Sequence, residues 1–390
     1  MITNKKKLRL LGNQGINISI IVISFLFSIS LYFFDYHFFY SKYTNFESFR
    51  DFGDLFLLLK GIDFYREGLN PFLLDYDPPY NYPSSWSFLK YFHFINKENT
   101  EVIAICLILI SLLLINELIK KQYHFFLVYV LALISPVSIL LFERGNSDII
   151  ILILALITGL LFYKRIIPVI IIIFIALALK LYPIVWFSVL LFFISKKNII
   201  FYLVTTLVFL TFFLYANQNE IMLINKNTPF DLSNFTYGIK VLLLRFQNLS
   251  LKKQIVEILL LITIIPLSLY LYRKKYIINK LEYSKYVFLF TIGVSTIFVT
   301  SLLTVSWDYR LFFLFLCFPF LIDNKRYFLI ILILLLFWYQ TFKMYFFYST
   351  FLIDLKQILL LCIVLNLSYI LINIIFLEIK NRKLNIQNNT

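Results

Sequence analysis

The stretch that decides the fold is Leu141–Ile150, LFERGNSDII, which places charged and polar side chains and one glycine between two long apolar runs. The runs cover residues 124–142 and 149–163, and both are almost continuously apolar. Runs of this length and continuity indicate helices, and Gly145 permits a tight turn between them. The stretch therefore predicts a helical hairpin, in which a polar residue after the glycine begins the second helix.

The composition extends this prediction to the whole chain. Of the 390 residues, 61% are hydrophobic and 15% are charged, and the mean hydropathy is +0.84. Several apolar runs approach the ~20 residues that a helix needs to cross a bilayer. Because lipid offers no partner to an unpaired backbone N–H or C=O, such runs must be helical, and their continuous hydrophobicity argues against a β-barrel. We predict an all-α polytopic membrane protein.

The net charge of +15 follows the membrane topology. Basic residues cluster between apolar runs, and the clusters hold 20 of the 36 Lys and Arg residues. An excess of Lys and Arg in alternate loops is typical of the cytoplasmic side of a membrane protein, so the charge does not indicate nucleic-acid binding. The clusters are residues 5–9, 120–121, 164–165, 196–197, 273–285, 325–326 and 380–383.

These clusters orient the predicted spans. With the N-terminus inside, the chain threads about twelve transmembrane helices and both termini are cytoplasmic. We expect a single integral membrane domain over residues 1–390, in the inner (plasma) membrane. The predicted spans are 16–34, 102–119, 124–142, 149–163, 166–180, 182–195, 199–216, 254–272, 287–304, 311–322, 327–347 and 353–377.

The polar interruptions that resemble motifs all fall on the outer side of this threading. The first outer loop, 35–101, contains apolar residues at helical spacing between Leu55 and Ile62, which predicts a helix lying in the membrane interface. Asp51 or Asp54 stands at its N-terminus. We therefore expect any chemistry on the outer face, where the interruptions are 35–101, 143–148, 180–183, 217–252 (the second long loop) and 305–310.

Two aspartates of the first loop are candidates for a general base. Asp51 and Asp54 are three residues apart, so on a helix they share one face near the membrane surface. A carboxylate there can deprotonate an acceptor hydroxyl. Alternatively, one of them caps the interfacial helix and interacts with the positive end of its dipole. The two residues can also divide these roles.

A turn-rich segment of the same loop suits a sugar. GLNPFLLDYDPPYNYPSSW, residues 68–86, combines prolines with aromatic faces and amide and carboxylate groups. Sugar rings present apolar C–H faces and hydroxyls that need directed partners, so Asn81, Tyr82 and Trp86 are candidate contacts. The alternative is an aromatic belt, because Tyr and Trp populate membrane interfaces in any case.

Three cations stand apart from the cytoplasmic clusters, at the outer ends of spans. Arg144, Lys180 and Arg310 can each hold a phosphate, or can pair with a carboxylate or reach toward water. Pairing is a strong alternative for the two arginines, which have carboxylates one to four residues away, whereas Lys180 has none nearby in sequence. The polar neighbours that complete the candidate sugar and acceptor contacts are Asn146, Asp148 and Asp308.

Several chemistries are excluded. The chain has no Walker loop and no GxSxG motif, and its three histidines have no metal-ligand spacing. The sequence therefore predicts neither a metal site nor a cofactor.

The order of these motifs resembles a known family. DFGD in the first loop, then GLNPF and NYPSSW, ERGNSD at 143–148, KLYP at 180–183 and SWDYRLFFL at 306–314 are similar to motifs of the GT-C superfamily of membrane glycosyltransferases. Within it the chain most resembles glycosyltransferase family 87, the mannosyltransferases that depend on polyprenyl-phosphate-mannose, and their bacterial relatives. The resemblance covers about residues 50 to 320.

The resemblance implies a hexosyltransferase of the cell envelope, with a polyprenyl-phosphate-sugar donor and a lipid or glycan acceptor. A first-loop aspartate is the base: Asp54 by its distance from GLNPF, Asp51 by the local DFG pattern. The acceptor hydroxyl attacks the anomeric carbon with inversion, and Arg144, Lys180 and Arg310 stabilise the departing phosphate. This chain has RGNSD where the family has a sequence closer to RGQ, and its late loop has no histidine, so sugar and acceptor stay open.

Two other classes of protein are alternatives. A flippase or transporter of lipid-linked sugars would use the same cations, but it predicts polar residues within the spans, accessible from both sides. A polysaccharide polymerase or ligase predicts a large late outer loop, whereas the longest predicted outer loop here is the first. Both comparisons favour chemistry at one face.

Overall fold

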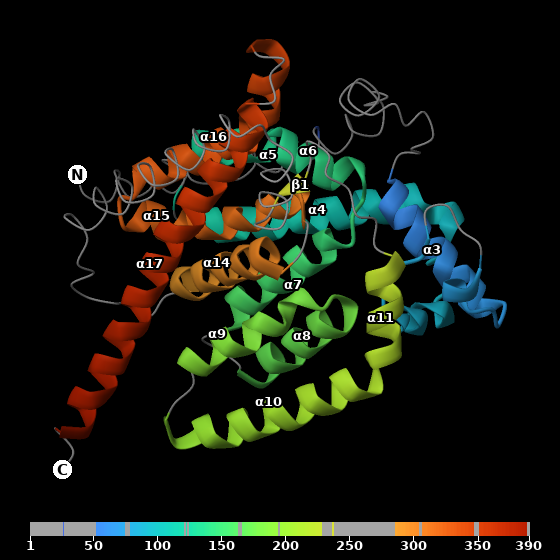
Figure 1. Ribbon diagram of the computed structural model, residues 1–390, viewed down its shortest axis with the longest axis horizontal. Helices are drawn as coiled ribbons and strands as arrows, with labels where there is room; N and C mark the ends of the chain where they lie inside the picture. Colours follow the sequence, from blue (N-terminus) through green and yellow to red (C-terminus); the bar gives the residue numbers. More distant parts are fainter. Residues whose placement is uncertain are drawn as a thin grey trace, which may run out of the picture. The chain divides into compact units, whose positions relative to one another are not determined.

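The computed structural model describes Leu26 and the ranges 52–74, 79–120, 122, 125–162, 166–193, 196–227, 236–237, 285–303, 306–346 and 351–387. Within these ranges the secondary structure is almost all helical, which confirms the predicted α-helical class (Figure 1). The exception is a two-residue ladder in which β1 (Thr236–Tyr237) pairs antiparallel with β2 (Ser306–Trp307), Thr236 opposite Trp307.

The described residues belong to two compact units. The first contains α3 (Gly53–Arg66), η1 (Pro71–Leu73), η2 (Ser84–Tyr91), η3 (Lys97–Asn99), α4 (Thr100–Ile119), α5 (Phe126–Leu133), most of α6 (Pro136–Glu143), α7 (Asp148–Leu161), α8 (Ile166–Leu179) and α11 (Gln218–Asn227). The second contains η5 (Tyr182–Ile184), α9 (Val185–Phe193), most of α10 (Lys196–Ala216), β1, β2, α14 (Lys285–Leu303), η6 (Asp308–Cys317), α15 (Phe318–Asp323), α16 (Tyr327–Phe346) and α17 (Phe351–Gln387).

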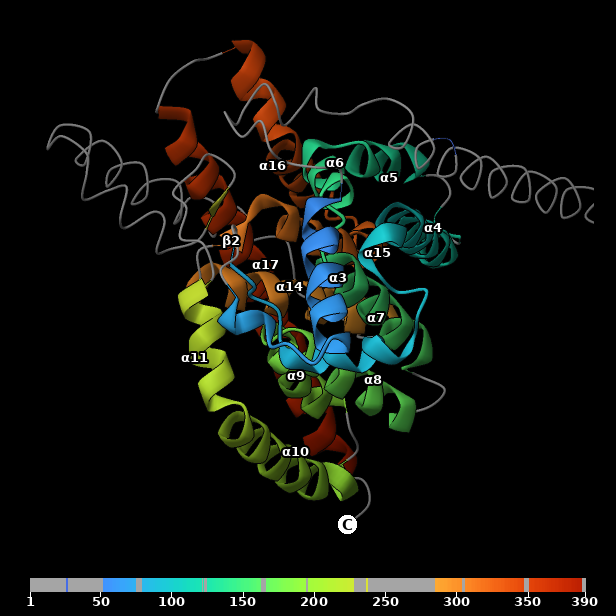
Figure 2. The same ribbon diagram turned by 90° about the vertical axis from the view of Figure 1, so that its right-hand side faces the viewer.

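The core of the first unit forms around α7, which packs against both α4 and α8. Ala155 and Gly159 of α7 lie four residues apart, hence on one side of the helix, and both are buried. Small residues at such positions let helix backbones approach closely, which is the usual packing mode where lipid surrounds a bundle. Helix α3, which faces the viewer in Figure 2, packs against η2 and also contacts α4.

The core of the second unit forms around α14, which packs against α9, η6 and α17. A Cβ added at Gly293 would lie 2.8 Å from the carbonyl oxygen of Phe313, so only glycine lets η6 approach α14 this closely. The rings of Phe290 and Phe320 pack with centroids 4.4 Å apart. The Nε1–H of Trp186 on α9 donates to Thr296 Oγ1 on α14 at 2.8 Å, which satisfies a buried indole.

A few of the described helices have the length and apolar composition of a membrane span. Among the described residues, Lys97–Ile119 and Lys356–Leu377 are long and apolar enough to cross a membrane, and two bent helix pairs raise this number to four if each pair is one span. Four other apolar helices have 10–17 residues, fewer than the ~20 that one straight span needs. Predicted spans 16–34, apart from Leu26, and 254–272 lie outside the described residues. The count of about twelve spans and the single domain stay predictions.

The helix predicted in the first loop exists as α3, with Asp54 in its first turn, and its place in the membrane interface stays a prediction. Gly61 on this helix sits against the buried ring of Tyr80: a Cβ added there would lie 2.1 Å from Tyr80 Cε2. The ring is held in place by edge contacts with Tyr65, Phe72 and Tyr82. It therefore has no simple way to yield to a larger residue at position 61.

Gly61→Ala is expected to lower stability. Alanine favours a helix by about 1 kcal/mol over glycine, but overpacking a rigid aromatic ring costs about 1–3 kcal/mol, so the clash prevails. Thermal unfolding of the purified protein in detergent measures the change. Gly61→Ala combined with Tyr80→Leu is the matched control and should regain part of the loss; equal stability of Gly61→Ala and wild type would contradict the close packing.

Candidate functional site

The turn between α6 and α7 is built by its sequence. The N–H of Gly145 donates to the carbonyl of Phe142 at 3.0 Å, and the N–H of Asn146 donates to that of Leu141 at 3.3 Å. This pair of bonds is the Schellman ending of a helix, and it needs a residue with positive φ, which Gly145 supplies at +57°. The predicted hairpin turn is therefore present, with Gly145 in the predicted role.

The start of α3 docks onto this turn. The N–H of Phe52 donates to the carbonyl of Glu143 at 2.8 Å, and that of Asp54 donates to the carbonyl of Arg144 at 3.1 Å. A Cβ added at Gly145 would lie 3.0 Å from Phe52 Cβ, so glycine also gives the two segments room to meet. Two pieces of chain 90 residues apart are thus fixed by backbone bonds, and this brings Asp54 beside Arg144.

The carboxylate of Asp54 is held on both oxygens. Arg144 Nε donates to Oδ2 at 2.9 Å and its Nη2 donates to Oδ1, so the guanidinium binds as a fork. The Nδ2 of Asn146 also donates to Oδ2. The side chains of Asp54 and Arg144 are only 14% and 15% exposed, so this pair is largely removed from water.

A second ion pair lies next to the first. Asp148 at the start of α7 is fully buried, and its Oδ1 lies 3.1 Å from Nζ of Lys180, which follows α8 and is 14% exposed. Asn146 joins the two pairs, because its Oδ1 accepts the N–H of Asp148 at 2.9 Å while its Nδ2 serves Asp54. The Asn146 amide therefore caps the second helix of the hairpin and binds the carboxylate of the first loop.

Tyr82 contacts one residue of each ion pair. Its hydroxyl donates to the backbone carbonyl of Asp54 at 3.0 Å, and its ring centroid is 5.7 Å from Nζ of Lys180, a cation–π distance. Nearby, the Nε1–H of Trp86 donates to the carbonyl of Leu179 at 3.1 Å, which ties the first loop to the end of α8. Asn81 is partly exposed beside Tyr82 in the chain.

Six of the residues described above form a group that we call the polar cluster. Its two carboxylates and two cations are almost buried in a largely apolar unit, where each unpaired charge would cost several kcal/mol. A charge network of this kind within an apolar helical protein can hold the helices together. It also supports the hypothesis that a functional site lies there. The polar cluster consists of Asp54, Tyr82, Arg144, Asn146, Asp148 and Lys180.

The ion pairs differ from those considered from the sequence. Lys180 has an acidic partner after all, because Asp148 reaches it across the α7–α8 packing. Arg144 pairs with the carboxylate of Asp54, which lies 90 residues away in the chain. Neighbourhood in sequence was a poor guide, since folding brings the ends of four helices, α3, α6, α7 and α8, to one place. The alternative candidate base, Asp51, lies outside the described residues.

The remaining predicted residues belong to the second unit. Nζ of Lys356 on α17 donates to both carboxylate oxygens of Asp308, at 2.9 Å each, and the two side chains are 1% and 2% exposed. The guanidinium of Arg310 lies over the rings of Tyr182 and Tyr309, at 5.7 and 5.8 Å from their centroids.

Lys356 was missed from the sequence. The available signal was Lys356 itself, the single lysine of the predicted span 353–377, because a charge within an apolar span is expensive enough to indicate a buried partner. Glu220 was missed as well: its carboxylate accepts the N–H of Ser84 at 2.6 Å and the Ser84 hydroxyl, so it ties α11 to the first loop. Burial, and secondarily the charge of Glu220, raises the pKa of Tyr65 to about 12, so this phenol is neutral at physiological pH.

Known proteins offer no guide to this site. Comparison with protein families, with curated proteins and with solved structures finds no match for the chain. Among the described residues, no group of three or more His, Cys, Asp or Glu side chains is placed to hold a metal ion. Function must therefore be inferred from the polar cluster itself.

Proposed function

We propose that the protein is an inverting membrane glycosyltransferase, which moves a hexose such as mannose from a polyprenyl-phosphate donor to a lipid-linked or glycan acceptor. One observation carries this proposal. Asp54, Arg144 and Lys180, chosen from the sequence as a base and two phosphate ligands, come from three separate segments and meet in one polar cluster. A base and two cations within one small volume are what the displacement requires.

The proposed setting is a chain of about twelve spans with both termini cytoplasmic, in the plasma (inner) membrane. The polar cluster then lies on the outer face, where a polyprenyl tail stays in hydrocarbon and presents its phosphate at the level of the helix ends. The GT-C-like arrangement, with α3 as an interfacial helix in the first outer loop, is part of the proposal.

In the proposed mechanism Asp54 accepts the proton of the acceptor hydroxyl. The hydroxyl oxygen attacks the anomeric carbon, the bond from that carbon to the phosphate oxygen breaks, and the polyprenyl phosphate leaves with the electron pair. Arg144 and Lys180 stabilise the charge that develops on the phosphate. The ring of Tyr82 and the partly exposed Asn81 are proposed to contact the sugar, and Trp86 supports them by its bond to the end of α8.

The resting ion pairs give this mechanism an order of events. Arg144 occupies both oxygens of Asp54, and Asn146 adds a third donor, so the carboxylate is blocked as a base. A phosphate competes for the same guanidinium fork, because carboxylate and phosphate match it equally well in geometry. Donor binding would therefore transfer Arg144 from Asp54 to the phosphate and free an oxygen of Asp54 for the acceptor.

Radiolabelled transfer tests the proposal. The purified protein in nanodiscs is given polyprenyl-phosphate sugars and lipid acceptors, and the same protein in liposomes is given a fluorescent donor whose movement between leaflets is followed. Transfer of one sugar without movement between leaflets is expected. Movement without transfer would identify a flippase, and addition of whole oligosaccharide units would identify a polymerase or ligase; either result overturns the proposal.

A further inference from the structure

The segment 88–95, FLKYFHFI, exposes an unusual number of aromatic rings. Phe88, Tyr91, Phe92 and Phe94 are 49%, 74%, 48% and 65% exposed. Single exposed apolar side chains are normal, but a contiguous group marks a surface that is covered by something. The question is which partner covers this group.

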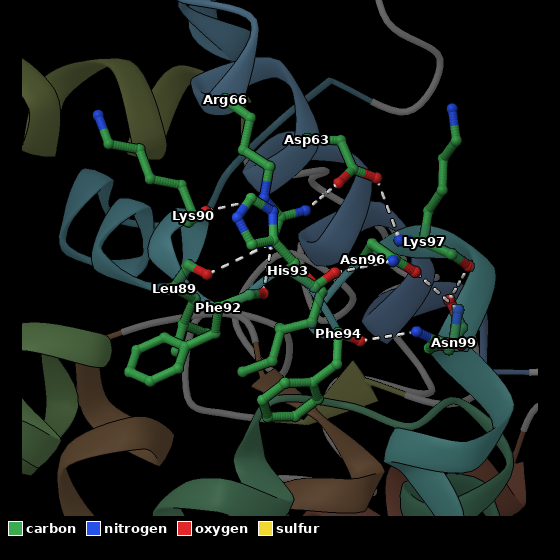
Figure 3. Close-up of polar contacts among 12 residues, drawn as sticks. Asp63, Arg66, Leu89, Lys90, Phe92, His93, Phe94, Asn96, Lys97 and Asn99 are labelled. Carbon is green, nitrogen blue, oxygen red and sulfur yellow. Dashed lines mark hydrogen bonds and ion pairs between the residues drawn. The ribbon is translucent and has the colours of Figure 1, made fainter.

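Several backbone carbonyls beneath these rings have side-chain partners within the protein. The guanidinium of Arg66, at the end of α3, donates to the carbonyls of Lys90 at 2.9 Å, Phe92 at 2.7 Å and Ile95 at 2.5 Å. Figure 3 shows the guanidinium among these carbonyl oxygens, with the rings of Phe92 and Phe94 directed away from it. Asp63 pairs with Arg66 and also accepts the N–H of Lys97 at 3.1 Å, so the arginine is itself neutralised.

Two asparagines complete this pattern. The Nδ2 of Asn96 donates to the carbonyl of His93 at 3.0 Å, and that of Asn99 donates to the carbonyl of Phe94 at 2.8 Å. The segment after η2 is not helical, so its carbonyls would otherwise need water. Non-helical backbone is tolerated at membrane depth only where its polar groups have protein partners. The arrangement therefore lowers the cost of placing this segment at the membrane surface, because these five carbonyls do not depend on water.

The chain continues directly into an apolar helix. Lys97–Ile119 is one of the two described segments long and apolar enough to cross a membrane. Aromatic rings just before a span lie at the level of the headgroups, where Tyr in particular keeps its ring in the apolar zone and its hydroxyl in water. This continuity selects lipid over a protein partner as the occupant of the exposed rings.

We propose that residues 88–95 form a lipid-binding platform that lies in the headgroup–acyl boundary of the bilayer, with Arg66 as the residue that holds its backbone in shape. The platform fixes the level at which the first loop meets the membrane. It rests on the proposed membrane location, but not on sugar transfer.

Spin labelling of the full-length protein in nanodiscs tests the platform. Cys106, Cys317 and Cys362 are replaced by serine, and a label is attached at Tyr91→Cys or Phe94→Cys; Glu67→Cys, exposed on the same unit, is the matched control. Relaxation by oxygen, which concentrates in lipid, relative to a water-soluble nickel chelate is expected to be severalfold higher at 91 and 94 than at 67. Equal ratios at all three positions, or dipolar broadening between labels of two copies, would overturn the proposal.

The role of Arg66 is tested separately. Lysine keeps the charge opposite Asp63 but lacks the planar fork that reaches several carbonyls at once. In Arg66→Lys, the nickel chelate should relax a label at position 94 severalfold more strongly than in the parent; an unchanged relaxation would show that Arg66 does not hold the platform. If the labels lie in lipid but the protein transfers no sugar, the platform is supported and only the proposed function fails. If the labels lie in water but the protein transfers sugar, only the platform fails.

Discussion

Asp54→Asn is expected to reduce sugar transfer by a factor of about 10² to 10⁴, the range that general-base catalysis supplies. The substitution keeps the size of the side chain and leaves the backbone carbonyl that Tyr82 binds unchanged. It removes the negative charge and the basic oxygen, so the acceptor hydroxyl has no group to take its proton. Initial rates at saturating donor and acceptor measure the effect.

Stability must be separated from chemistry in this experiment. Asp54→Asn also leaves the guanidinium of Arg144 without its carboxylate at a site that is mostly buried, which costs on the order of 3 kcal/mol. Arg144→Gln added to Asp54→Asn removes both charges and should recover most of the lost melting temperature. Transfer should stay low in this double variant, because no base has returned.

The transfer rates and melting temperatures of these variants distinguish a catalytic role of Asp54 from a structural one. If the double variant regained both stability and transfer, Asp54 and Arg144 would be a structural ion pair only. Asp51→Asn is the matched control from the same loop and should transfer at the wild-type rate. Loss of transfer in Asp51→Asn together with full activity in Asp54→Asn would move the base to Asp51.

Lys180→Met is expected to have the largest effect on stability. It leaves the carboxylate of Asp148, which is fully buried, without its cation, and breaking one side of a buried pair costs about 3–5 kcal/mol. For 390 residues the shift is about 1 °C per kcal/mol, so the melting temperature in detergent should fall by about 4–6 °C. Removing both charges, in Asp148→Asn with Lys180→Met, should cost far less, since buried pairs are often replaced by neutral residues with little loss.

The same pair of variants tests donor binding. If Lys180 holds the donor phosphate, the double variant should fold well and yet show a raised KM for the donor. A double variant with restored stability and an unchanged donor KM would restrict Lys180 to the support of α7 and α8. A melting temperature of Lys180→Met alone that equals the wild-type value would show that the Asp148 carboxylate is not confined as the structure has it.

Local sequence predicted the parts of the site that depend on local rules. Gly145 was identified as the turn residue because a tight helix ending needs positive φ, and the Schellman bonds bear this out. Asp51 or Asp54 was placed at the N-terminus of a helix by apolar spacing, and Asp54 lies in the first turn of α3. Such features are encoded within a few residues and need no knowledge of the rest of the chain.

The partners of charged residues were not predictable in the same way. Lys180 had no acidic neighbour in sequence, and Asp148 lies 32 residues before it on another helix. The pairing of Asp308 with Lys356 spans 48 residues. These contacts depend on how helices pack, and no spacing rule within one helix reports on that. A single charged residue in an apolar run indicates that an oppositely charged partner exists, but it does not indicate where in the chain that partner lies.

The helical fold was predictable from apolar runs, but the helix types were not. The predicted span at 311–322 begins as the 3₁₀-helix η6, and the first loop contains another, η2. Tight helices of this length are uncommon, and composition alone gives no sign of them. Gly293, which lets η6 approach the backbone of α14, is the one local hint.

The equal number of acids and bases in the polar cluster would govern how the proposed phosphate donor reaches it. The charges of Asp54, Arg144, Asp148 and Lys180 sum to zero, so the site projects little field beyond the Debye length, about 10 Å at 0.1 M salt. A phosphate would not be drawn in from solution; it would arrive by diffusion within the membrane and exchange partners on contact. Donor affinity should therefore depend only weakly on ionic strength, in contrast to sites where unmatched lysines and arginines collect anions from water.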